Sequence, residues 1–157
     1  MSTISLLKKN VGVILEKKKL NNVVARVGLV LDISGSMRNL YRNGTVQKVV
    51  ERILAVASQF DDDGQLDVFI NDGGCKKTIK KPVVSSSNKP IFWQFVGIGD
   101  SNFEVLKKLD EMEGRFIDNA NFFHIQDIEK ISDDELYNKL LHEFPSWLQE
   151  AKEKGVL

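Results

Sequence analysis

The feature that most constrains this chain is an apolar run that ends abruptly in three oxygen-bearing side chains. Residues 27–31 read Val-Gly-Leu-Val-Leu. Such a run predicts a strand that is buried on both faces, as in the middle of a parallel sheet. Asp32, Ser34 and Ser36 follow at alternate positions, so their side chains point to one side of an extended turn. Gly35 is expected to let the backbone bend so that the oxygens converge.

These three side chains predict a site for a small, hard cation. One carboxylate and two hydroxyls suit Mg²⁺ or another hard divalent ion, and they suit zinc or copper poorly. Open α/β sheets also bind ligands at the carboxyl ends of their strands. The alternative is a strand followed by a polar turn whose serines cap a helix. The apolar run before the motif and the amphipathic segment after it favour the metal.

The remaining periodicity predicts alternating helices and strands in one domain that spans residues 1–157. Helical spacing of apolar residues predicts helices over 4–18 and 45–60. The other expected elements are strands at 66–70, 91–98 and 115–117, helices after the capping boxes at 101–104 and 132–135, and a final helical turn or two at 146–154. This order is typical of an α/β fold with a Rossmann-like, open, mainly parallel sheet that is flanked by helices.

Composition favours a cytoplasmic protein without a nucleic-acid partner. The 22 basic and 22 acidic residues give a formal net charge of zero, whereas nucleic-acid-binding domains usually carry a basic excess. Cys75 is the single cysteine, so no disulfide can form within the chain, and a reducing compartment is expected. We see no signal peptide and no run of the roughly 18 apolar residues that a membrane span needs.

The segment Asp32-Ile33-Ser34-Gly35-Ser36-Met37 resembles the metal-ion-dependent adhesion site of von Willebrand factor type A (vWA) domains. The wider sequence is similar to the intracellular, tellurium-resistance branch of this family, which is called TerF-like. The segments that carry the similarity are Ala25–Met37, 49–54 followed by 60–64, 90–99 and 144–148. The resemblance implies Mg²⁺ bound to Ser34 and Ser36, a partner protein whose Asp or Glu completes the shell of the metal, and a role in stress or tellurium resistance.

A fourth candidate ligand, Asp72, lies in the segment Asn71-Asp72-Gly73-Gly74 directly after the expected strand at 66–70. This segment reads either as a hairpin turn or as a loop that aims Asp72 at the cation bound near Asp32. The second interpretation resembles the late acidic motif of the family, and both interpretations stay open. Asp32 and Asp72 would then contact the metal directly or through water. Asp100, at the end of the strand at 91–98, is a weaker candidate.

The chain departs from the family near Ile70-Asn71. A family member has about six strands, and a loop that carries a threonine ligand lies between the second strand and the late acidic loop. Roughly fifty residues are missing here. Two explanations are open: the segment is absent from this sequence, or an internal deletion makes one strand serve as two. Thr45 is the nearest substitute for the threonine, and it is expected to begin a helix. A deletion would also expose a sheet edge.

The leading prediction is therefore a Mg²⁺-dependent protein-binding module and not an enzyme. A phosphatase of the haloacid-dehalogenase type needs a second Asp two residues after the first, and Ser34 stands there. A serine hydrolase needs G-x-S-x-G, and Ile33-Ser34-Gly35 lacks the first glycine. The other alternative is a structural scaffold with a vestigial metal site.

Overall fold

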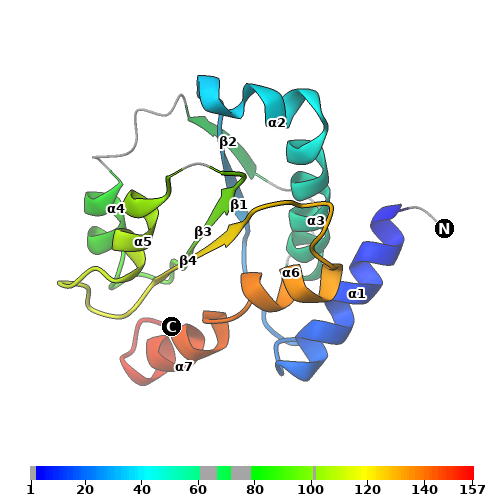
Figure 1. The fold of residues 1–157 in the computed structure, drawn as a ribbon. Helices are drawn as coiled ribbons and strands as arrows, with labels where there is room; N and C mark the ends of the chain where they lie inside the picture. The colour runs from blue at the N-terminus through cyan, green and yellow to red at the C-terminus, as the bar shows by residue number, and fades with distance from the viewer. Residues whose placement is uncertain (1–2, 61–66, 72–78, 101) are drawn as a thin grey trace. The chain divides into compact units, whose positions relative to one another are not determined.

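The computed structural model describes residues 3–60, 67–71, 79–100 and 102–157 (Figure 1). The chain divides into two compact units. The first unit contains Met1–Gly73 and Ile128–Asn138, and the second contains Gly74–Asp127 and Lys139–Leu157. Each unit combines helices with a pair of parallel strands, which confirms the α/β class. The single domain over 1–157 stays a prediction.

The first unit is built on two packed helices and one strand pair. Its elements are α1 (Thr3–Lys17), β1 (Gly28–Asp32), the 3₁₀ turn η1 (Gly35–Met37), α2 (Arg38–Arg42), α3 (Thr45–Phe60), β2 (Asp67–Asn71) and most of α6 (Asp133–Leu140). The apolar face of α1, with Leu7, Val11 and Ile14 buried, packs along α3. Both helices therefore form where the spacing of apolar residues predicted them.

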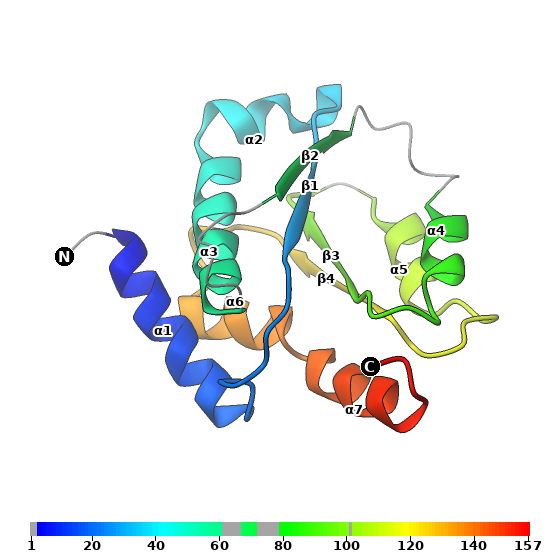
Figure 2. The ribbon, with the colours of Figure 1, turned by 180° about the vertical axis from the view of Figure 1, so that it is seen from behind.

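Strands β1 and β2 pair in parallel, with Gly28 opposite Asp67 and Asp32 opposite Asn71 (Figure 2). The prediction that β1 is buried on both faces is wrong, because none of its residues is fully buried and Val30 is 55% exposed. That prediction assumed a wide sheet with a neighbour on each side of the strand. Among the described residues β1 has one strand partner, so apolar residues that would suit a sheet interior remain open to solvent.

Asp133 joins three helices of the first unit through its carboxylate. Its Oδ1 lies 3.0 Å from Nε of Arg52 on α3, and its Oδ2 accepts a hydrogen bond of 3.1 Å from Asn10 on α1. Arg52 also donates to the carbonyl oxygen of Ile128. These contacts bring α6 against α1 and α3, as Figure 1 shows. The ring of Tyr137 is fully buried on the same helix, and burial raises the pKa of its phenol.

The second unit pairs β3 with β4 and covers the pair with short helices. Its elements are α4 (Lys80–Ser85), β3 (Trp93–Ile98), α5 (Glu104–Asp110), β4 (Ala120–Ile125) and α7 (Phe144–Glu153). The strands run parallel, with Trp93 opposite Ala120. Helix α5 packs on β4. The core includes one cluster around Val83 and Leu109 and another around Ile117 and Trp147.

One prediction in the second unit needs correction. The expected strand at 115–117 is wrong: Arg115 donates hydrogen bonds to the carbonyl oxygens of Met112 and Asp110, which hold this segment in a bend, and the strand begins later, at Ala120. Helix α6 ends at Leu140, and Pro145 lies in the first turn of α7, where a missing N–H costs nothing. Within the described ranges, no helix is long and apolar enough to cross a membrane.

In the second unit, the carboxyl groups of Asp110 and Glu143 lie in surroundings that disfavour their charged forms. Burial, followed by the negative charge of Asp118, raises the pKa of Asp110. Burial, followed by the charges of Asp110 and Asp118, raises the pKa of Glu143. Asp110 is also the last residue of α5, where the helix dipole disfavours a negative charge. Ionisation of Asp110 and Glu143 therefore lowers the free energy of unfolding.

We expect Asp133→Ala to lower the free energy of unfolding by about 1–3 kcal/mol, because it removes the ion pair and leaves Arg52, whose side chain is 18% exposed, without its carboxylate. Urea unfolding measures the change. The matched control is Asp134→Ala, since Asp134 also lies in the first turn of α6 but is exposed. It should change stability by no more than about 0.5 kcal/mol. Equal losses in the two variants would contradict a structural role for the carboxylate of Asp133.

We expect Asp110→Asn to stabilise the protein at pH 7. The pKa of Asp110 is higher in the folded state than its ordinary value of 3.8, so the folded state binds this proton more tightly than the unfolded state does. The free energy of unfolding then falls as the pH rises between these two values. The advantage of the variant should shrink as the pH falls through this window and vanish below 3.8. Urea unfolding from pH 3 to 8 tests this, with the exposed Glu113→Gln as a control.

Candidate metal site

The three predicted ligands of the first strand lie together where β1 ends. Asp32 is the last residue of β1, Ser34 precedes the turn η1, and Ser36 lies within it. The carboxylate Oδ1 of Asp32 accepts a hydrogen bond of 2.7 Å from the backbone N–H of Ser34. This closed turn points the loop back toward the carboxylate. Gly35 lacks a positive φ, and an added Cβ would meet nothing within 4 Å, so the turn does not depend on glycine.

The two serine hydroxyls have a spacing that fits a shared cation. Ser34 Oγ and Ser36 Oγ lie 2.9 Å apart, and either can donate a hydrogen bond to the other. Magnesium binds oxygens at about 2.0–2.1 Å in an octahedron, so two neighbouring ligands lie about 2.9 Å apart. The same positions therefore suit either a hydroxyl–hydroxyl hydrogen bond or two adjacent ligands of Mg²⁺. Ser36 is exposed and Ser34 is half-buried, so the loop is open to solvent.

Tyr41 on α2 also contacts the loop, through the backbone of Asp32. No sequence pattern predicted this role. Its hydroxyl donates a hydrogen bond of 3.1 Å to the backbone carbonyl oxygen of Asp32. Partial burial, followed by the charge of Asp32, raises the pKa of the Tyr41 phenol, so the group keeps its proton near neutral pH. Tyr41 lies nine residues after Asp32 in the sequence, in the second half of α2.

Of the other three candidate residues, two lie in the described part of the chain. Asp72 lies outside the described residues, although the strand before it ends at Asn71, opposite Asp32. Thr45 begins α3 as predicted, and its backbone N–H donates to the side chain of Asn43. Asp100 belongs to the second unit, where it accepts a hydrogen bond from Gln126. Among the described residues, no group of three or more His, Cys, Asp or Glu could hold a metal ion.

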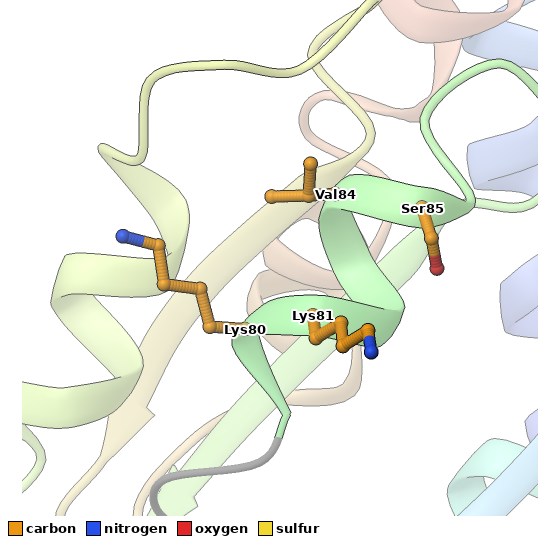
Figure 3. A pocket seen from close by; sticks show the side chains of 4 residues that line it. All are labelled: Lys80, Lys81, Val84 and Ser85. Carbon is orange, nitrogen blue, oxygen red and sulfur yellow. The ribbon is translucent and has the colours of Figure 1, made fainter.

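A second surface feature lies on α4 in the other unit. A shallow depression of about 440 Å³ is lined by Lys80, Lys81, Val84 and Ser85 (Figure 3). The side chains of the two lysines extend in different directions. They therefore do not converge on one anion. The depression does not gather polar groups at one point as the loop after β1 does.

Parallel strands, flanking helices and an acid followed by two alternate serines define the class of vWA-type α/β domains. The sequence pattern of the vWA-TerF-like family, described as a vWA domain found in the C terminus of TerF, matches residues 24–70 and 68–157. The chain belongs to this family, as the resemblance implied.

The chain is 50% identical to the uncharacterized protein YcbR of Bacillus subtilis (strain 168). This alignment spans 221 positions and covers 100% of the chain and 91% of the relative. The chain has 157 residues, so 64 aligned positions have no counterpart in it. The two family matches overlap at residues 68–70, which places the predicted gap at β2. No solved structure matches the chain.

Proposed function

We propose that this chain is a Mg²⁺-dependent protein-binding module. Ser34 and Ser36 would bind the ion directly, while Asp32 and Asp72 would contact it directly or through water. The observation that carries the proposal is the spacing of 2.9 Å between the two hydroxyls, beside a carboxylate that already holds the loop. A hard cation such as Mg²⁺ prefers these oxygens. The bound ion would supply a coordination position for a carboxylate from outside the chain.

A partner protein can reach this position because the loop faces solvent. Ile33, Gly35 and Ser36 are all exposed. An Asp or Glu of the partner would complete the shell, which links partner binding to metal binding. Membership of the TerF-like family supports a cytoplasmic role in stress or tellurium resistance as part of this proposal.

The same loop is less suited to catalysis. The position two residues after Asp32 carries a hydroxyl, which is a poor general acid or base near neutral pH. Tyr41, the other protic group beside Asp32, donates to a backbone carbonyl and has a raised pKa. We therefore propose binding rather than hydrolysis. If the loop bound no metal, the remaining interpretation would be a structural scaffold.

We expect calorimetric titration with Mg²⁺ to show saturable binding to the wild type. Asp32→Ala and the double variant Ser34→Ala/Ser36→Ala should each bind Mg²⁺ at least tenfold more weakly, because each loses hard oxygen ligands. Mg²⁺ should also raise the melting temperature of the wild type and not that of these variants, since an ion that binds only the folded state stabilises it.

The control is Asp134→Ala/Ser146→Ala, which removes an exposed carboxylate and an exposed hydroxyl elsewhere in the chain. It should bind Mg²⁺ like the wild type. If Asp32→Ala gave the same heats and the same thermal shift as the wild type, the metal site would be refuted.

A further inference from the structure

We propose that the surface around the metal loop recognises an acidic segment of a partner protein, in which neighbouring carboxylates pair with Arg38 and Arg42. This inference rests on the proposed function, since one acid of the segment would reach the metal. It goes further in naming the chemistry of the partner and the residues that select it.

Helix α2 brings the two arginines to the loop. It begins at Arg38, directly after η1 and two residues beyond Ser36, and Figure 2 shows it beside the end of β1. Arg38 and Arg42 are four residues apart, so they share one face of the helix. Both are exposed. Within the described part of the chain, neither guanidinium has an ion pair or a side-chain hydrogen bond.

The local charge is positive although the chain as a whole is neutral. Residues 33–50 contain no acidic residue and three basic ones. Of these three, Lys48 is paired with Glu129, which leaves the two arginines on α2. A bound divalent cation would balance the charges of Asp32 and Asp72, which leaves the two arginines as the positive charge of this surface. The surface therefore complements a segment with several carboxylates, and guanidinium groups bind carboxylates through two parallel hydrogen bonds.

Apolar side chains stand next to these charges. Ile33, which lies between Asp32 and Ser34, is 50% exposed. Tyr41, which lies between Arg38 and Arg42 on α2, is 39% exposed. The hydroxyl of Tyr41 is held by the carbonyl oxygen of Asp32, so its ring is presented in a fixed position. Tyrosine and arginine are enriched among residues that dominate binding at protein interfaces. The surface thus combines a metal anchor, two cationic contacts and a rigid apolar contact.

The experiment measures binding of a fluorescein-labelled deca-glutamate peptide by fluorescence anisotropy, in saturating Mg²⁺ and low salt. We expect Arg38→Gln/Arg42→Gln to weaken binding at least tenfold. The matched control is Lys9→Gln/Lys17→Gln, which removes two exposed positive charges from α1 in the same unit, and it should stay within twofold of the wild type. Raising NaCl from 50 to 300 mM should weaken wild-type binding, because salt screens exposed charges.

Separate measurements distinguish this inference from the metal site itself. Calorimetry should show that Arg38→Gln/Arg42→Gln still binds Mg²⁺ like the wild type. If that variant also bound the peptide like the wild type while Asp32→Ala did not, the arginine surface would be wrong and the metal site would stand. Binding that is insensitive to EDTA but lost in the arginine variant would support the surface and contradict the metal-dependent function. Equal binding of deca-glutamine, or tighter binding of a ten-nucleotide oligothymidine, would overturn the acidic protein partner.

Discussion

The hydrogen bond from the backbone N–H of Ser34 to the carboxylate of Asp32 is the interaction on which the candidate site depends. At 2.7 Å it turns the chain immediately after β1, and that turn brings the hydroxyls of Ser34 and Ser36 within 2.9 Å of each other. Tyr41 secures the backbone of the same aspartate. One oxygen of this carboxylate therefore shapes the loop, and in the proposed site the other would face the metal.

Local pattern was enough to predict most helices and the loop of the site. The apolar spacing of α1 and α3 survives in the structure because each helix buries one stripe against the other. The convergence of Ser34 and Ser36 was predicted from an extended turn, but the structure brings the two hydroxyls together through the 3₁₀ turn Gly35–Met37. The predicted capping box at Ser132 holds as well, because its hydroxyl accepts the N–H of Glu135.

Features that depend on distant partners could not be predicted in this way. The strand Ala120–Ile125 was missed because it carries Asn121, whose side-chain amide donates to Gln94 across the strand pair. The exposure of Val30 could not be read from β1 itself, since burial depends on which strands and helices surround it. Tyr41 was overlooked for the same reason, because its contact joins the helix after the loop to the strand before it.

The overlap of the two family matches at Val68–Ile70 has a consequence for how such chains change length during evolution. Since β1 and β2 run in the same direction, the strands of this sheet finish at a common rim. Suppose that whole strand–helix repeats are deleted and the start of one strand is joined to the end of another. The combined strand then keeps the direction of the original strands. The same excision from an antiparallel hairpin would reverse the chain. A parallel architecture can thus shed modules while Asn71 still lies opposite Asp32.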